Sequence, residues 1–269
     1  MAPAVSLLLP SFNSGRFLAC ALRSALDQGD VELEVLVQDA GSRDGSLDQA
    51  ATELADPRVR LRQEPDGGQS DALNRALARA DGEWVGWLNA DDLLESGGLA
   101  TLLGAARDDL GAVFGDFRTI DPDGRSLKTY TSAALETRRL FRHGHYIFSG
   151  AMLIRRTVLE RLGGFDAGLN YCMDYDLLLR LAASTPTQHV DAIVAAYREQ
   201  PASKTRLAPW GFLWEHTRVA RSHGGFRRPY ILATSRAILA HSAYQASRRL
   251  WQTDTWRRLR PAKHRGGKG

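Results

Sequence analysis

Two adjacent carboxylates, Asp91 and Asp92, follow an apolar and aromatic stretch at residues 83–90, "EWVGWLNA". Neighbouring acids at the end of a buried strand suit a hard divalent cation, Mg²⁺ or Mn²⁺, whose remaining ligands are phosphate oxygens. A bound cation also removes the repulsion between the two carboxylates. The pair therefore predicts a site for a metal and a diphosphate. The alternative interpretation is that Asp92 caps a following helix and Asp91 is solvated.

Polar segments end three other stretches that resemble buried strands, at residues 5–12, 33–41 and 59–64. In an open parallel sheet, ligands bind at the carboxyl ends of the strands, which meet at one edge. The pattern therefore predicts a ligand site along this edge. The four strand ends read "PSFNSG", "QDAGSRDG", "EPDGGQSD" and "NADD".

The elements that must position these side chains alternate regularly over the first hundred residues. Each apolar strand is followed by an amphipathic helix, which is typical of a parallel sheet covered on both faces. We therefore predict an α/β fold with a Rossmann-like, mostly parallel sheet. The pattern loosens after Asp92, where strands are expected at residues 112–120, 151–156 and 187–198 and a helix at 173–183.

The chain has 269 residues, enough for one large domain with an appendage. Its two cysteines, Cys20 and Cys172, are too few for a disulfide framework or a zinc site, which favours a reducing compartment. Cys172 is expected to be a small buried apolar residue. No secretory signal and no membrane span is recognised, so we expect a cytoplasmic protein.

Five segments occur in the order seen in family-2 glycosyltransferases, and the chain resembles that family over roughly residues 5–200. These are inverting enzymes with the GT-A fold. The segments are "SLLLPSFNSGRFLACALRSALDQ", "VLVQDAGSRDGSLD", "EPDGGQSDALNRALARADGEWVGWLNADD", "RRTVLERLGGFDAGL" and "MDYDLLLRLA". The resemblance implies a GT-A catalytic domain at residues 1–200, with a nucleotide-binding half at 1–110 and an acceptor half at 111–200.

The resemblance also implies donor-binding roles. Pro10, Ser11 and Asn13 would line the nucleotide pocket, Asp39 would bond the base, and Asp71 would contact the nucleoside.

Asp91 and Asp92 resemble the family's DxD-type motif. One would contact ribose or phosphate and the other the metal, and the sequence leaves open which does which. The usual first Asp of the motif is Asn89 here. A neutral amide is a poorer metal ligand, so the metal-binding role shifts to the two acids.

Asp174 matches the family's catalytic base. Inverting transfer requires one carboxylate that accepts the proton of the acceptor hydroxyl, and the first turn of a helix would present it. Asp176 is expected to point away and to pair with Arg180. The alternative is that Asp174 only stabilises the helix N-terminus.

Residues 221–269 carry twelve Lys or Arg and one acid, a net charge of +11, so residues 1–220 carry −7 of the total of +4. We predict a helical basic extension at 201–258 and a disordered tail at 259–269. Such a surface suits anionic lipid headgroups, and the alternative is a charged face that only increases solubility. No nucleic-acid signature accompanies the charge. Trp210 and Trp214 share a helix face. We expect them in the core, with a sugar-stacking platform as the alternative.

The resulting hypothesis is metal-dependent, inverting transfer of a sugar from a nucleotide-diphosphate donor, a UDP-sugar, to a glycan or lipid-linked acceptor. The expected setting is bacterial surface polysaccharide assembly, peripheral on the inner membrane. The alternatives are a non-catalytic nucleotide-sugar-binding scaffold and a nucleotidyltransferase.

Overall fold

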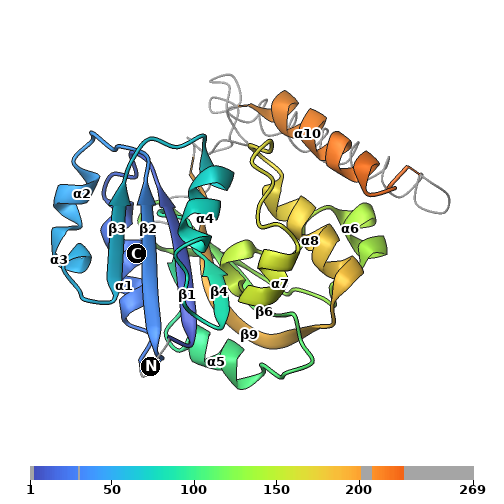
Figure 1. The fold of residues 1–269 in the computed structure, drawn as a ribbon, viewed down its shortest axis with the longest axis horizontal. Coiled ribbons are helices and arrows are strands. Elements are labelled where there is room, and N and C mark those ends of the chain that lie inside the picture. Colours follow the sequence, from blue (N-terminus) through green and yellow to red (C-terminus); the bar gives the residue numbers. More distant parts are fainter. Residues whose placement is uncertain (1–2, 30, 201–207, 227–269) are drawn as a thin grey trace, which may run out of the picture.

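The computed structural model describes residues 3–29, 31–200 and 208–226. Its first half contains four parallel strands in the order β3-β2-β1-β4 (Figure 1). Their bounds are β1 Val5–Ser11, β2 Leu33–Asp39, β3 Val59–Gln63 and β4 Trp84–Trp87. All seven residues of β2 are buried, because helices cover both faces of the sheet there.

The second half extends the same sheet with a mixture of directions. After β4 the order continues β8-β6-β9-β5, with β7 paired to β6. β8 is antiparallel to β4 and β6, β6 is parallel to β9, and β5 is antiparallel to β9. The bounds are β5 Leu93–Leu94, β6 Ala112–Ile120, β7 Ser126–Tyr130, β8 Met152–Arg155 and β9 Thr187–Arg198.

Two apolar clusters form the core, one on each face of the sheet. Leu8 of β1 belongs to the cluster formed with α4, α6, α7, α8 and α10, whereas Leu7 and Leu9 belong to the cluster formed with α1 and α5. The helices are α1 Phe17–Leu26, α2 Ser46–Gln49, α3 Ala51–Leu54, α4 Gln69–Leu77, α5 Gly98–Gly104, α6 Thr137–His143, α7 Arg156–Arg161, α8 Met173–Ser184 and α10 Pro209–Ser222, with a 3₁₀ turn, η1, at Ser149–Ala151.

The segment after Asp92 does not support the alternative interpretation that Asp92 caps a helix. Asp92 is followed by the short strand β5, and α5 begins later, after Gly97 in a left-handed conformation. Asp92 therefore caps no helix, because its carboxylate is engaged with β9 instead. Strand β4 is also shorter than the predicted 83–90, since the chain leaves the sheet as it enters the polar turn.

Helix α10 packs against α8 and lies at one end of the molecule (Figure 1). Phe212 and Val219 are buried, but Trp210 and Trp214 are 72% and 65% exposed, so their prediction as core residues is wrong. They lie one helical turn apart on the side opposite the buried residues. The predicted tail at 259–269, and all of the predicted extension apart from residues 208–226, lie outside the described residues. Within the described segments no helix is both long and apolar enough to span a membrane.

Candidate functional site

The loops after β1 and β2 are tied together by side-chain hydrogen bonds. Asp39, fully buried at the end of β2, accepts hydrogen bonds from the backbone N–H of Gly41 and from both the N–H and the hydroxyl of Ser42, at 2.6–3.0 Å. Asn13 has a left-handed backbone with φ 49°; its Oδ1 accepts from the Arg43 N–H, and its N–H donates to the Ser42 hydroxyl. The two loops therefore form one rigid wall. It includes Ser11, which pairs with Asp39 in the sheet.

Asn89 links three elements through its amide. Its Oδ1 accepts from Trp87 Nε1 at 2.9 Å and from Gln69 Nε2 at 2.7 Å, and its Nδ2 donates to Asp92 Oδ2 at 2.8 Å. A carboxylate at position 89 could accept the first two bonds but could not donate the third. It would also face Asp92 with a like charge. The departure of Asn89 from the DxD pattern therefore has a structural reason in this chain.

Asp92 is fully buried and bonded on both oxygens. Oδ1 accepts from the Arg198 N–H at 2.8 Å, and Oδ2 accepts from Asn89. Burial and the neighbouring charge of Asp91 raise the pKa of Asp92 well above its ordinary value. Its side chain holds the 89–92 turn against β9.

Asp91 is only partly buried. Its Oδ2 accepts from Gln200 Nε2 at 2.6 Å, and its carbonyl accepts from Arg198 Nε at 2.7 Å. Burial raises the pKa of Asp91, and the hydrogen bond from Gln200 and the Arg198 charge partly offset this effect. Of the two adjacent acids, Asp91 is therefore the more exposed.

The start of α4 joins this turn to the acceptor half. Gln69 bonds Asn89, and the hydroxyl of the next residue, Ser70, donates to the Leu169 carbonyl at 2.8 Å. Asp71 accepts from the Gly67 N–H and pairs with Arg75, and these contacts lower the pKa of Asp71. Asp71 therefore stays ionised at the same edge of the sheet, facing the turn after β3.

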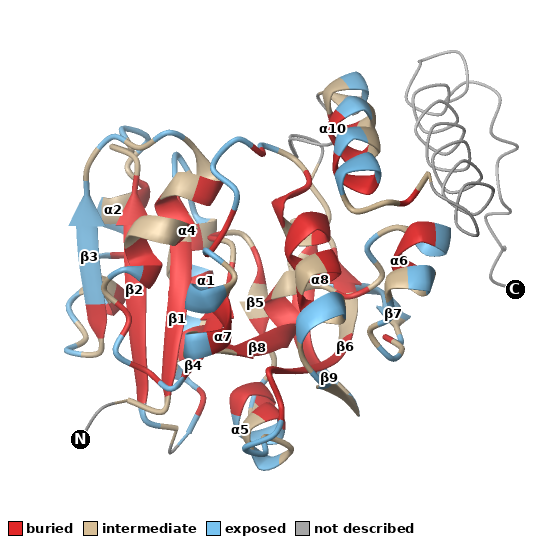
Figure 2. Cartoon of the chain, turned by 45° about the vertical axis from the view of Figure 1, so that its right-hand side comes forward, coloured by how far each residue is buried: buried red, intermediate tan, exposed pale blue. Residues whose placement is uncertain are grey.

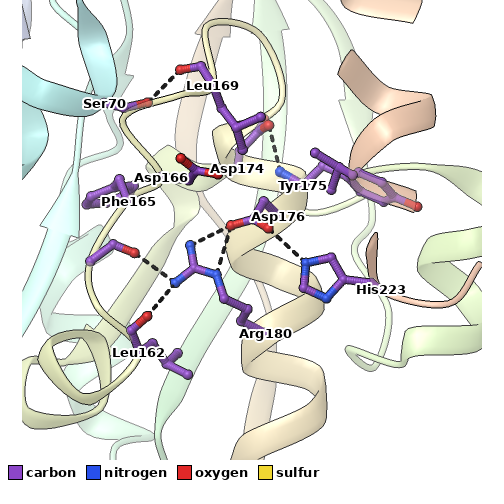
Figure 3. Close-up of polar contacts among 12 residues, drawn as sticks. Ser70, Leu162, Phe165, Asp166, Leu169, Asp174, Tyr175, Asp176, Arg180 and His223 are labelled. Atoms are coloured by element: carbon purple, nitrogen blue, oxygen red, sulfur yellow. Dashed lines mark hydrogen bonds and ion pairs between the residues drawn. The ribbon is translucent and has the colours of Figure 1, made fainter. Parts of the chain in front are cut away.

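Asp174 lies in the first turn of α8, half-buried, with its Oδ1 accepting from the Tyr175 N–H at 2.7 Å (Figure 3). It lines a small, mostly apolar cavity together with Val85, Trp87 and Phe165. Trp87 also donates to Asn89, so the residue that lines the cavity beside Asp174 is hydrogen-bonded to the 89–92 turn.

The loop before Asp174 is anchored by α10. The Glu215 carboxylate, 3% exposed, accepts the backbone N–H groups of Asn170, Tyr171 and Cys172 at 2.9, 2.6 and 2.7 Å. The His216 ring stacks on that of Tyr175, with centroids 4.3 Å apart. Helix α10 therefore fixes where α8 begins.

Asp176 points away from Asp174, as predicted, and pairs with Arg180 at 2.6 Å (Figure 3). Its other oxygen bonds His223 Nε2 at 2.8 Å. Arg180 also donates to the carbonyls of Leu162 and Gly164. Hydrogen bonds from His223 and Arg180 and the Arg180 charge outweigh burial and lower the pKa of Asp176. Cys172 is fully buried, as expected, and burial raises the pKa of its thiol.

Hydrogen bonds and shared neighbours place the predicted residues at one edge of the sheet in two groups. The first group, at the ends of β1 and β2 and in the loop after β1, comprises Pro10, Ser11, Asn13 and Asp39. The second group is centred on the 89–92 turn and comprises Asp71, Asp91, Asp92 and Asp174, connected through Gln69 and Trp87.

Sequence reasoning missed four residues that hold this site: Gln69, Arg198, Gln200 and Glu215. Gln69 lies two residues before Asp71, within the segment "EPDGGQSDALNRALARADGEWVGWLNADD" quoted for the family resemblance, and could have been found. Arg198 and Gln200 lie more than one hundred residues from Asp91, so no local pattern connects them.

The candidate metal site has few protein ligands. Among the described residues no group of three or more His, Cys, Asp or Glu side chains is placed to hold an ion. Asp91 offers a partly accessible carboxylate beside the polar edge, whereas both oxygens of Asp92 are already bonded. This donor set fits a hard cation that takes most of its ligands from phosphate and water.

The family model described as "Glycosyl transferase family 2" matches residues 6–163, more than half of the chain. The chain belongs to glycosyl transferase family 2. The family predicted from the sequence, and with it the enzyme class of glycosyltransferase, is therefore confirmed.

Curated relatives include the chondroitin synthase of Escherichia coli, 28% identical over 200 residues, and the hyaluronan synthase of Pasteurella multocida, 30% identical over 200 residues. Each alignment covers 71% of this chain but only 28% and 20% of the respective relative. The chain therefore spans about a quarter of the length of these proteins.

Solved structures show the same fold. The TarS fragment 1–349 of S. aureus in complex with UDP-GlcNAc superposes with a TM-score of 0.65 at 18% identity, covering 93% of this chain and 74% of that one. The mannosyltransferase PcManGT of Pyrobaculum calidifontis, in complex with GDP-Man and Mn²⁺, gives 0.63 at 22% identity, covering 96% and 83%. The predicted GT-A fold is confirmed.

Proposed function

We propose that this chain transfers a sugar, with inversion, from a nucleotide-diphosphate donor to a hydroxyl of a glycan or lipid-linked acceptor. One observation carries the proposal. Asp174 lines the same small cavity as Trp87, and the Trp87 indole N–H donates to Asn89 of the 89–92 turn. A candidate base linked through one side chain to a candidate phosphate-binding turn suits a donor bound beside both.

The donor's nucleoside would bind along the wall formed by the loops after β1 and β2. Asp39 and Ser11 lie where this wall meets the sheet. Phe12, which is 62% exposed, offers an aromatic face on which the nucleobase could stack. The bound nucleotides of the structural neighbours, UDP-GlcNAc and GDP-Man, support a nucleotide-sugar donor. We favour a uridine donor.

Asp91 would hold the divalent cation, Mg²⁺ or Mn²⁺, and Asp92 would hold the turn that carries Asp91. The Mn²⁺ complex of PcManGT supports the use of a divalent cation. When bound, the cation would supply positive charge for the departing diphosphate. Asn89, Gln69 and Arg198 keep the turn in place through hydrogen bonds that do not need the cation.

Asp174 would act as the general base. The acceptor oxygen attacks the anomeric carbon from the side opposite the diphosphate, the bond to the diphosphate oxygen breaks, and the hydroxyl proton passes to the Asp174 carboxylate. The Tyr175 N–H at 2.7 Å fixes one oxygen of Asp174, leaving the other to accept the proton.

The curated relatives suggest a setting in bacterial surface polysaccharide assembly, since several are polysaccharide synthases. We place the reaction at the inner face of the membrane, with the +11 segment at 221–269 drawn to anionic lipids.

The test combines donor binding and turnover. A panel of nucleotide sugars is screened by thermal shift with Mn²⁺, and turnover of the best donor is then measured for Asp174→Asn, Asp91→Asn and the exposed control Asp109→Asn. We expect Asp174→Asn to lower turnover about 100-fold or more with UDP affinity unchanged. Asp91→Asn should weaken Mn²⁺-dependent UDP binding, and the control should do neither.

Full turnover by Asp174→Asn would contradict the assignment of the base. A wild-type chain that binds nucleotide sugars without turnover would indicate a scaffold, and a preference for a nucleoside triphosphate would indicate a nucleotidyltransferase.

A further inference from the structure

We infer that the outer face of α10 is a docking surface for an anionic lipid membrane. The face consists of Trp210, Trp214, Arg218 and Arg221, and is called the α10 face below. Membrane docking does not require that the chain transfers a sugar. Only the conclusion that docking brings a lipid-linked acceptor to Asp174 rests on the proposed function.

The α10 face combines aromatic and basic side chains in one stripe. Trp210, Trp214 and Arg218 follow one another at intervals of four residues, so they lie on one side of the helix. All are exposed, and the two indoles are the most exposed large apolar side chains among the described residues, at 72% and 65%. Figure 2 shows exposed and buried residues alternating along this helix, as expected for a helix that packs on one side only.

The charges on the α10 face indicate which partner binds there. Helix α10 contains one acid, Glu215, and that carboxylate is buried against the loop before α8. The exposed charges of the helix are therefore basic, with the Arg218 guanidinium 5.1 Å from the Trp214 ring. In sequence the helix leads into the 221–269 segment with its charge of +11. Indole rings with arginines and no exposed acid match the headgroup region of a membrane that contains anionic lipid.

The attachment of α10 makes this face relevant to the site. Glu215 binds three consecutive backbone N–H groups just before α8, and His216 stacks on Tyr175, next to Asp174. A membrane bound to the outer face of α10 would lie one helix diameter from that loop. A lipid-linked acceptor would therefore be held near Asp174.

The experiment uses the full chain and sedimentation with vesicles of phosphatidylcholine alone or with 30–40% phosphatidylglycerol, roughly the range in which surface charge drives binding. We expect binding to the anionic vesicles, weakened by salt. Trp210→Ala/Trp214→Ala should lower the partition coefficient about tenfold or more, since one decade corresponds to the loss of a modest apolar contact. Arg218→Gln should lower it several-fold. The matched control Arg125→Gln, an exposed arginine in the turn between β6 and β7, should leave it unchanged.

Three outcomes would overturn the inference. The first is equal vesicle binding by the wild type and the double-tryptophan variant. The second is binding of a soluble oligosaccharide, seen as quenching of the Trp210 and Trp214 fluorescence, in place of vesicle binding. The third is self-association of the chain through these residues. UDP binding by calorimetry separates the two proposals. It should be unchanged in the double variant, whereas its absence in the wild type would count against the proposed function and not against docking.

Discussion

Replacement of Glu215 by Gln tests whether the loop before Asp174 depends on a buried carboxylate. The carboxylate accepts three backbone N–H groups at 2.6–2.9 Å and is 3% exposed. Hydrogen bonds to a charged group contribute about 1.5–3 kcal/mol each, and a buried donor left unpaired costs about 1–3 kcal/mol. An amide keeps one acceptor oxygen and turns an NH₂ group toward the remaining N–H groups. In the wild type, one carboxylate oxygen accepts one of the three hydrogen bonds and the other oxygen accepts two, so replacing one oxygen by NH₂ removes one or two of them. We therefore expect Glu215→Gln to lower the free energy of unfolding by about 2–5 kcal/mol.

The assay is urea unfolding followed by circular dichroism, with the exposed pair member Glu160→Gln as the matched control, for which we expect a change below about 0.5 kcal/mol. A second readout separates positioning of Asp174 from general stability. At a temperature where the variant is folded, turnover should fall while UDP affinity stays within about twofold, because the nucleotide wall is held by other hydrogen bonds. A Glu215→Gln protein as stable as wild type would refute the reasoning, as would a selective loss of UDP binding.

Three further perturbations follow from the structure. Burial and the charge of Asp91 raise the pKa of Asp92 above its ordinary value of 3.8, so the native state binds the Asp92 proton more tightly than the unfolded state does. The stability that this proton contributes is fully present below pH 3.8 and is lost as the pH rises through the raised native-state pKa. Asp92→Asn should therefore flatten the pH dependence of unfolding above pH 4, and parallel profiles would exclude the idea. Gly82→Ala should lower the free energy of unfolding by about 1–3 kcal/mol in thermal unfolding, because the added Cβ would lie 2.5 Å from the Ser6 nitrogen. The control Gly104→Ala, whose Cβ would meet no neighbouring atom, should be neutral or stabilising. Equal effects of the two substitutions would contradict the prediction. Phe12→Ala should weaken UDP binding about 2- to 10-fold in calorimetry without changing the melting temperature, and unaltered affinity would remove Phe12 from the nucleotide wall.

Local pattern was sufficient for the parallel half of the fold. Strands β1 and β2 are continuous apolar runs between amphipathic helices, and that arrangement is stable only when both faces of a sheet are covered. The Asp176–Arg180 pair could also be predicted, because residues four apart on a helix always face each other.

Contacts between distant segments decided the rest. Asp92 is bonded to β9, more than one hundred residues away, and this contact buries it and leaves Asp91 as the more accessible acid. Asn89 looked like a weakened metal ligand, yet its amide is needed to donate to Asp92.

The sequence by itself determined the strand–helix order of the first hundred residues, the family and the types of chemical group at the sheet edge, because these depend on neighbours in the chain. Only the tertiary structure decided which acid is accessible, what anchors the Asp174 loop, and that Trp210 and Trp214 face outward. The periodicity of α10 indicates two faces, but burial is assigned by what packs against each face, and that partner lies elsewhere in the chain.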